Sequence, residues 1–196
     1  DKTVTVPEGS VANTYDAGRF YYDENGMYRY RSNYYDVQTG IDVSAHQGKI
    51  DWQAVADSGV EFAMIRVGYR GYTAGSVNLD TRFSTNIEEA KAAGLKVGVY
   101  FFSQAITPEE AEEEAAFVLE QIRPYDIDFP VVYDWESISG DRARTDGLDS
   151  AVLNQCAAAF TAKVAEAGYT PAVYYYTWLG YFMYDQSLLS DYYIWY

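Results

Sequence analysis

Short apolar runs alternate with longer amphipathic segments through most of the chain. The runs have the length and the β-branched or aromatic content of strands, and they cover residues 40–44, 60–67, 95–102, 129–135, 171–176 and 192–196. The segments between them show helical periodicity or helix-capping residues, and they cover residues 52–58, 81–93, 108–122, 149–167 and 178–184. Apolar strands that alternate with helices predict an α/β fold with a parallel sheet covered by helices.

Some boundaries of these segments carry their own signals. Thr107 and Pro108 open the third helix with a capping residue and a proline at the first helical position, and Glu110 can complete a capping box. We expect Asp80 to cap the second helix. The glycine-rich residues 68–78 read as a loop.

Residues 1–39 differ from the rest, because they are rich in Tyr, Asp, Asn and Gly and show no helical periodicity. The stretch Phe20–Tyr30 predicts a β-hairpin, with Asn25-Gly26 as its turn. An aromatic hairpin is similar to cell-wall-binding repeats, but a single copy has no neighbour against which to bury its faces. We therefore interpret residues 1–39 as an N-terminal arm on a main domain that spans residues 40–196.

Composition and charge exclude several classes of protein. The net charge of −15 argues against a nucleic-acid partner, since phosphate binding needs clustered Lys and Arg. No run approaches the ~20 apolar residues of a membrane-spanning helix. One cysteine, Cys156, excludes an internal disulfide and is expected to be buried in the core. With His46 as the one histidine, a His/Cys metal site or a Cys-His nucleophile is disfavoured, and we predict no metal and no cofactor.

Polar residues gather where the predicted strands end. Parallel α/β folds place their sites at the carboxyl ends of strands. No Gly-x-Gly-x-x-Gly follows the first strand, which argues against a dinucleotide-binding fold. The strand-end residues are Asp42, Ser103, Gln104, Asp134, Glu136 and Thr177.

The stretch Val131–Glu136 ends in two acids at positions i and i+2, so Asp134 and Glu136 should project from one face of a strand. Like charges held close together raise at least one pKa, which gives a proton donor that works near neutral pH. Paired carboxylates of this kind suit hydrolysis of a glycosidic bond. Carboxyl separations of about 5–5.5 Å belong to retaining enzymes and about 6.5–9.5 Å to inverting ones, and assistance by a substrate acetamido group is a third route. The strand end by itself leaves these routes open.

Four motifs occur in order: Asp-Val-Ser-Ala-His-Gln-Gly at 42–48, Asp-Trp at 51–52, Val-Tyr-Phe-Phe at 99–102 and Tyr-Asp-Trp-Glu at 133–136. Together they resemble glycoside hydrolase family 25, the lysozymes that cleave peptidoglycan between N-acetylmuramic acid and N-acetylglucosamine. The resemblance implies an irregular TIM-like β/α barrel of about five helices and eight strands. It also implies a hydrolase that acts on bacterial peptidoglycan glycan strands.

The resemblance assigns roles to individual residues. Glu136 matches the general acid, and Asp134 matches the second carboxylate, which would stabilise positive charge or orient the 2-acetamido group. Asp42 matches the family's opening aspartate and should line the same pocket. Tyr100 and Tyr174 match pocket tyrosines that contact substrate.

Strand-end positions suggest further, weaker binding candidates in Trp135, Trp178 and Gln104. We expect His46 to make structural hydrogen bonds in its loop, because a glycosidase of this kind needs no imidazole.

The family continues beyond this chain's last residues with two more strands and another pocket carboxylate, so we expect a barrel that lacks its last strands. The enzyme is expected to be a monomer that works outside the cell or on the cell wall, although no signal peptide is present in the chain. Two alternatives stay open: a chitinase-like hexosaminidase, which shares the Asp-x-Glu strand end, and a non-catalytic glycan-binding derivative.

Overall fold

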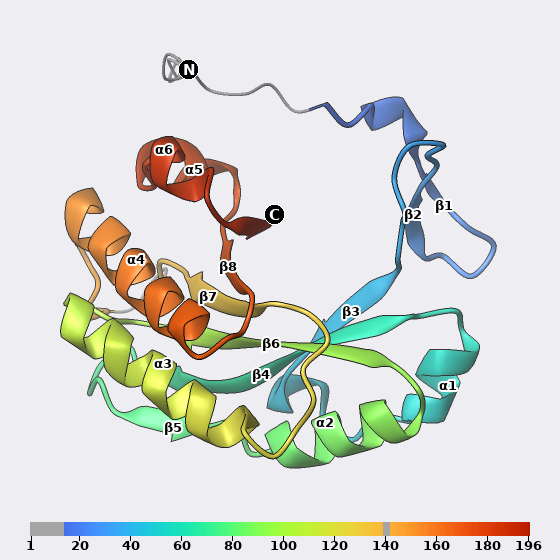
Figure 1. Ribbon diagram of the computed structural model, residues 1–196, viewed down its shortest axis with the longest axis horizontal. Coiled ribbons are helices and arrows are strands. Elements are labelled where there is room, and N and C mark those ends of the chain that lie inside the picture. The colour runs from blue at the N-terminus through green and yellow to red at the C-terminus, as the bar shows by residue number, and fades with distance from the viewer. Residues whose placement is uncertain (1–13, 139–141) are drawn as a thin grey trace.

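The computed structural model describes residues 14–138 and 142–196 and contains one main sheet flanked by helices (Figure 1). The strands of the main sheet are β3 (Gly40–Val43), β4 (Phe62–Arg70), β5 (Val77–Leu79), β6 (Lys96–Ser103), β7 (Val131–Trp135), β8 (Pro171–Tyr174) and β9 (Tyr193–Trp195). The α-helices are α1 (Trp52–Asp57), α2 (Phe83–Ala92), α3 (Pro108–Ile122), α4 (Ser150–Glu166), α5 (Thr177–Phe182) and α6 (Gln186–Leu189).

The predicted parallel sheet is confirmed. Its strand order is β3-β4-β6-β7-β8-β9, every pair along this path is parallel, and the short β5 pairs antiparallel with β4. The sheet curls like half of a barrel, as a TIM-like fold requires (Figure 1). Over the described residues, β3 and β9 are its two edges and do not pair with each other.

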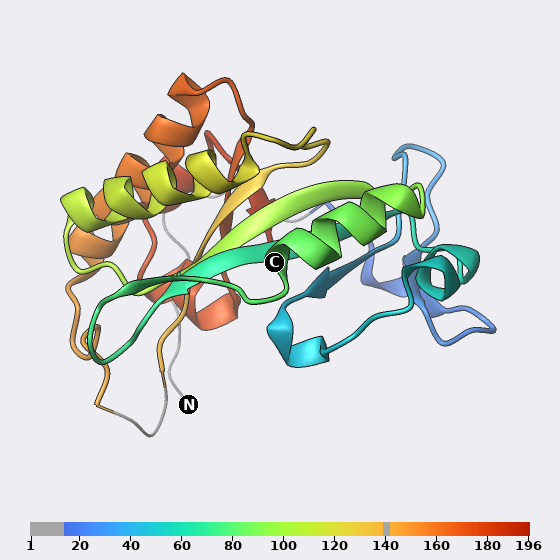
Figure 2. The same cartoon turned by 90° about the horizontal axis from the view of Figure 1, so that it is seen from below.

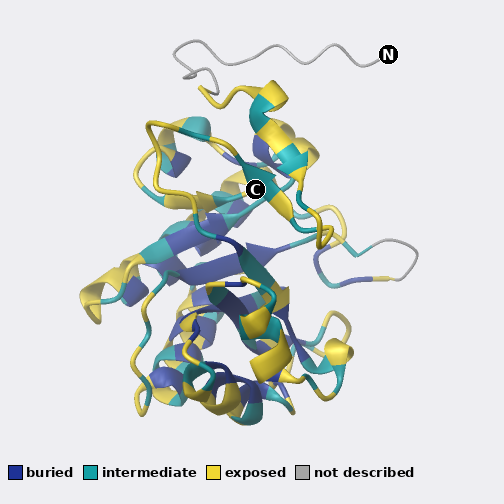
Figure 3. Cartoon of the chain, turned by 90° about the vertical axis from the view of Figure 1, so that its right-hand side faces the viewer, coloured by how far each residue is buried: buried dark blue, intermediate teal, exposed yellow. Residues whose placement is uncertain are grey.

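The two faces of the curled sheet have different environments. The outer face packs against helices, and Figure 2 shows α2 and α3 running along this side of the strands. Within the strands, every second side chain points to the opposite, inner face. The buried side chains there form a smaller cluster, made of Met64, Tyr100, Val132 and Ala172. Figure 3 shows the buried positions concentrated in the strands at the centre of the molecule. We call these surfaces the outer face and the inner face.

The expected loop at residues 68–78 is partly wrong. Strand β4 continues to Arg70, and the chain returns in β5 to form a hairpin, with Gly68 paired to Leu79. A Cβ atom at Gly68 would lie 2.3 Å from the carbonyl oxygen of Asn78, so only glycine allows this close approach. The glycines that suggested a loop are therefore, at this position, a condition for strand pairing.

Other local predictions agree with the structure. Helix α3 covers Pro108–Ile122 as expected, and the Thr107 hydroxyl accepts a hydrogen bond from the Glu110 backbone N–H. Cys156 is fully buried in α4. The described residues include no helix that is both long and apolar enough to cross a lipid bilayer.

The first 13 residues of the expected N-terminal arm lie outside the described part of the chain. A 3-10 turn, Ala17–Arg19, leads into strands β1 (Phe20–Tyr22) and β2 (Tyr28–Tyr30), which pair antiparallel as a hairpin. Arg29 connects this hairpin to the start of β3, because its guanidinium donates to the Thr39 hydroxyl at 2.6 Å.

Candidate active site

Strand alternation directs Asp134 to the inner face of the sheet. Val131, Tyr133 and Trp135 pack into the large core on the outer face, whereas Val132 belongs to the inner-face cluster. Asp134, which alternates with Tyr133 and Trp135, therefore lies on the same side as Val132. Glu136 follows β7 directly and keeps the same parity.

Strand register brings the other predicted residues to this place. Asp134 lies opposite Tyr174 of β8, and Tyr100 of β6 lies opposite Val132. Asp42 comes from β3, at the edge of the sheet, and its charge raises the pKa of Asp134. The inner face thus gathers three acids, Asp42, Asp134 and Glu136, which we call the inner-face acids.

Burial dominates the electrostatics of Asp134. The residue is 5% exposed, and burial followed by the charges of Glu136 and Asp42 holds the pKa of its carboxyl well above its ordinary value. Its Oδ1 atom is buried and has no hydrogen-bond partner among the described residues. A buried acceptor without a partner is costly to a fold, so this atom is available to a ligand.

Glu136 is only partly buried, and that burial raises the pKa of its carboxyl above its ordinary value. No hydrogen bond links its carboxyl to the described residues, while its backbone carbonyl accepts from the Gln104 side chain at 2.8 Å. A half-buried acid with a raised pKa beside a second carboxyl is suited to donating a proton near neutral pH.

Aromatic side chains line the inner face beside the acids. Tyr100 and Tyr174 each meet the Trp195 ring edge to face, with centroids 5.5 Å and 5.2 Å apart. Burial, and then the charges of the three inner-face acids, raise the pKa of Tyr174 to about 12, so its hydroxyl stays a proton-bearing hydrogen-bond donor. Trp195 was not among the predicted site residues, because an aromatic residue in an apolar strand gives no separate functional signal.

Arg66 is a second residue that sequence reasoning missed. It lies opposite Tyr100 on β4, and its positive charge lowers the pKa of Asp134, although burial outweighs it. The guanidinium is bound to Asp80, at 2.8 Å from both Nε and Nη2 to Oδ2. Asp80 also accepts from the backbone N–H groups of Ala45 and Arg82, so it joins β4 to the segment after β3. The expectation that Asp80 caps α2 is wrong, because Arg82 is the N-cap residue and no side chain of the described residues caps that helix. Position 66 has the same parity as Met64 and therefore lies on the same face of β4, and that parity was the available signal.

Two predicted substrate-binding residues lie in the interior instead. Trp135 is 2% exposed and faces the outer core, because it has the opposite parity to Asp134. Gln104 has no exposed surface, and its amide bonds to protein groups. Trp178 is 45% exposed on α5 and packs against Phe182 at 5.8 Å, and no described contact joins it to the inner-face acids.

Two hollows open near these residues. One has a volume of about 500 Å³ and lies between Arg66, Tyr69, Tyr72 and Phe102. Phe102 is paired with Asp134 across β6 and β7, so this hollow adjoins the acids. The second hollow has a volume of about 450 Å³ and is lined on the inner face by Met64, Val132 and Trp195. None of the three acids lines either hollow, but both hollows are lined by residues of the strands that carry the acids or pair with them. Concave, largely apolar surfaces of this kind are typical of ligand sites.

Comparisons with known proteins agree with this geometry. Residues 41–196 match the sequence model of glycosyl hydrolases family 25. The chain is 42% identical over 65 residues to lysozyme M1 of Streptomyces globisporus and 36% identical over 74 residues to the autolytic lysozyme of Clostridium acetobutylicum. These matches cover 33% and 38% of this chain but only 20% and 21% of the two relatives.

Solved structures show the same fold. The modular autolysin LytC from Streptococcus pneumoniae superposes with a TM-score of 0.63 at 27% identity, over 82% of this chain and 38% of that protein. The bacterial lysozyme from Streptomyces coelicolor superposes with a TM-score of 0.58 at 25% identity, over 73% of this chain and 65% of that one. With four fifths of its length matched by the family model and with this barrel-like sheet, the chain belongs to glycosyl hydrolases family 25.

Proposed function

We propose that this chain is the catalytic part of a muramidase, which hydrolyses the β-1,4 bond between N-acetylmuramic acid and N-acetylglucosamine in bacterial peptidoglycan. The observation that carries the proposal is the inner-face pair of Asp134 and Glu136, with raised pKa values and an orphan oxygen on Asp134. Family membership and similarity to bacterial lysozymes support it. The enzyme would work outside the cell or on the cell wall, where this substrate lies.

Glu136 acts as the general acid. Burial raises the pKa of its carboxyl and so favours the protonated form, and that proton passes to the glycosidic oxygen as the bond to C1 breaks. Because the side chain is only half-buried and none of the described residues bonds its carboxyl, it can meet the substrate. In the second half of the reaction the Glu136 carboxylate takes a proton from the attacking water.

Asp134 orients the sugar rather than donating to it. Its free Oδ1 atom can accept the N–H of the 2-acetamido group, which turns the acetamido carbonyl oxygen toward C1. That oxygen then forms a bond to C1 while the leaving oxygen departs, and water later opens the cyclic intermediate with retention at C1. Asp42 lines the same pocket, and the Tyr100 and Tyr174 side chains contact the sugar.

Product analysis tests the proposal most directly. Digestion of purified peptidoglycan followed by mass spectrometry should yield fragments with muramic acid at the new reducing end. Glucosamine at that end would contradict a muramidase and indicate a glucosaminidase, and release from chitin oligomers would indicate a chitinase-like enzyme. Binding to peptidoglycan without any cleavage would indicate a glycan-binding derivative.

A further inference from the structure

The position of the proposed acid depends on its backbone. Glu136 lies one residue beyond the end of β7, outside the regular strand, and no described group bonds its carboxyl. A general acid must nevertheless stay within hydrogen-bond reach of the oxygen that it protonates. Something else must therefore fix the main chain from which the carboxyl projects.

The Gln104 side chain bonds the main chain at Glu136. Its Nε2 atom donates to the Glu136 backbone carbonyl at 2.8 Å and to the Ser103 carbonyl at 2.9 Å. Its Oε1 atom accepts from the Thr145 hydroxyl at 2.8 Å. Gln104 and Thr145 are 0% and 5% exposed, so water does not compete for these bonds.

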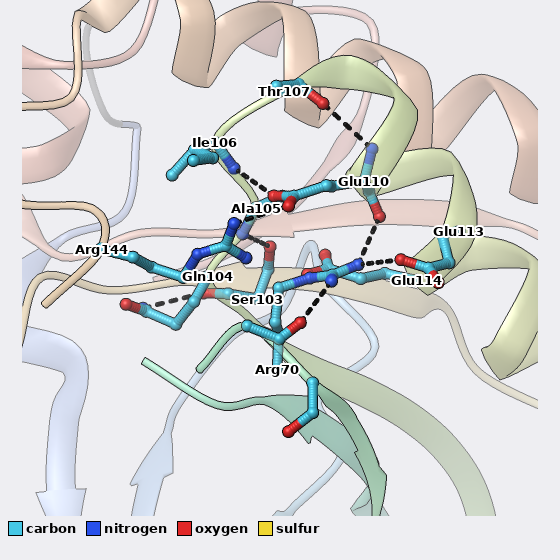
Figure 4. Close-up of polar contacts among 12 residues, drawn as sticks. Arg70, Ser103, Gln104, Ala105, Ile106, Thr107, Glu110, Glu113, Glu114 and Arg144 are labelled. Carbon is cyan, nitrogen blue, oxygen red and sulfur yellow. Dashed lines mark hydrogen bonds and ion pairs between the residues drawn. The ribbon is translucent and has the colours of Figure 1, made fainter. Parts of the chain in front are cut away.

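Thr145 is itself anchored through its neighbour Arg144. The Arg144 backbone N–H donates to the Tyr72 carbonyl at 2.7 Å, and its Nη2 donates to the Glu110 carboxylate at 2.6 Å. Figure 4 shows Arg144 reaching across to Glu110 at the start of α3, close to Gln104. Residues 144 and 145 are thus held against Tyr72 and Glu110, and the Gln104 side chain links Thr145 to the Glu136 backbone.

We propose that Gln104 is a positioning residue for Glu136, and that the Thr145 hydroxyl sets the orientation of the Gln104 amide. A carboxamide suits this position because it donates to one backbone carbonyl and accepts from one hydroxyl at the same time. The inference rests on the proposed function of Glu136, but the bonds themselves are independent of it.

Two substitutions test the inference through the split between kcat and KM. Gln104→Met keeps the side-chain length but removes both polar atoms, and should lower kcat on peptidoglycan by about 100-fold, because a misplaced group costs that much in rate. KM should stay within about twofold, since Gln104 does not reach the substrate. Thr145→Val removes only the hydroxyl and should lower kcat by about fivefold, the effect of one hydrogen bond.

Thr161→Val is the matched control. Thr161 is also buried, but its hydroxyl bonds only to the Ala157 and Ala158 carbonyls of its own helix. The control should keep the kcat of the unmodified enzyme. A folded Gln104→Met enzyme with unchanged kcat overturns the inference, as does an equal loss of kcat in Thr145→Val and Thr161→Val.

Gln104→Glu tests the inference through the pH dependence of kcat, which a merely structural role would not change. This variant also replaces Gln104→Met if that variant does not fold. The introduced carboxyl can still donate to the Glu136 carbonyl when it is protonated, whereas an ionised carboxylate at this position cannot. The ratio of the variant's kcat to that of the unmodified enzyme should therefore rise as pH falls. A ratio that is flat with pH, while the variant stays folded, overturns the inference.

A titration separates this inference from the proposed function. Carbon-13 NMR of labelled glutamates, with the Glu136 signal identified by its loss in Glu136→Gln, follows the carboxyl without any substrate. Loosening the backbone in Gln104→Met should let water reach the carboxyl and move its midpoint down toward the ordinary value of about 4.3. An unchanged midpoint overturns the positioning role, whereas inactivity of the unmodified enzyme on every cell wall would overturn only the proposed function.

Discussion

Two groups of acids in this molecule have opposite surroundings. The α3 acids, Glu110, Glu113 and Glu114, are bound by arginines: Arg70 bonds Glu113 and Glu114 at 2.7 Å each, and Arg144 bonds Glu110 at 2.6 Å (Figure 4). Within residues 14–138 and 142–196 the inner-face acids have no such partners, since Arg66 is bound to Asp80. Charges that hold a fold together are paired, and charges left unpaired on a concave face are available for chemistry.

The pKa values alone would not separate the two groups. Burial raises the pKa of Glu114 to about 7 despite Arg70, and it also raises the pKa values of Asp134 and Glu136. The difference lies in the partners. Arg70 is 4% exposed and donates through all three of its nitrogens, and one of these bonds holds the Glu114 Oε1 atom. Glu114 Oε2 is, like Asp134 Oδ1, buried without a hydrogen-bond partner among the described residues, so the two acids differ in the arginine and not in the orphan oxygen. Asp134 has no arginine bound to its carboxyl among the described residues.

The largest expected effect is the loss of the proposed acid. Glu136→Gln should lower peptidoglycan hydrolysis by about 10³-fold, within the range for general acid catalysis, while the protein stays folded. Glu113→Gln is the matched control on α3, because that side chain is 64% exposed, and it should keep full activity. Turbidity clearing of cell walls measures both, and an active Glu136→Gln enzyme would remove Glu136 from the mechanism.

Breaking the paired group should instead affect stability. Arg70→Met leaves Glu114 buried without its cation and should lower the free energy of unfolding by about 3 kcal/mol at pH 8. The loss should be smaller at pH 5. Without Arg70 the folded-state pKa of Glu114 rises further above its unfolded value, so the protonated fold is the stable one and stability falls as pH rises through that pKa. Urea unfolding at the two pH values measures this.

The control for that experiment is Arg123→Met. Arg123 follows the same helix, is exposed and forms no ion pair among the described residues, so the substitution should change stability little at either pH. Equal losses in the two variants would mean that the α3 network contributes no specific stability.

The sequence predicted those parts of the molecule that depend on local signals. Helix α3 was predicted at both ends, because Thr107 and Pro108 fix its start independently of the rest of the fold. The direction of the Asp134 side chain, toward the inner face, follows from the alternation of side chains along β7 alone. Arg66 and Trp195 were missed because they lie on other strands, and only the strand register shows that Arg66 lies opposite Tyr100 and Trp195 opposite Tyr174. Gln104 was misplaced because position at a strand end does not reveal burial.

A matched pair of amide substitutions sharpens the comparison further. Asp134→Asn should lower hydrolysis by about 100-fold, since the amide nitrogen or a weaker acceptor replaces the carboxylate. It should also raise stability at pH 7 but not at pH 4. The raised folded-state pKa of Asp134 means that its contribution to stability is lost as pH rises above its unfolded value near 4, and the amide avoids that loss.

Glu114→Gln makes the same chemical change in the paired group and should have the opposite effect. It leaves the buried Arg70 guanidinium with one carboxylate fewer, and we expect this cost to outweigh the gain from removing an acid whose pKa is raised to about 7, so the unfolding temperature should fall at pH 8. Thermal unfolding of both variants at pH 4 and pH 8 tests the contrast. If both substitutions moved the unfolding temperature in the same direction at pH 8, the distinction between the two groups of acids would fail.

The smallest expected effect tests where the inner-face site ends. Tyr174 lies opposite Asp134 across β7 and β8, and burial, followed by the charges of the inner-face acids, raises the pKa of its hydroxyl, so the hydroxyl can donate a hydrogen bond to the sugar. Tyr174→Phe should lower kcat/KM by about fivefold, the effect of one hydrogen bond, with little change in stability. Tyr169→Phe is the control, because Tyr169 packs on the outer-face core. Kinetics on soluble peptidoglycan fragments measure both variants. Equal kinetics for Tyr174→Phe and the unmodified enzyme would confine the site to the acids, with Tyr174 serving only to pack against Trp195.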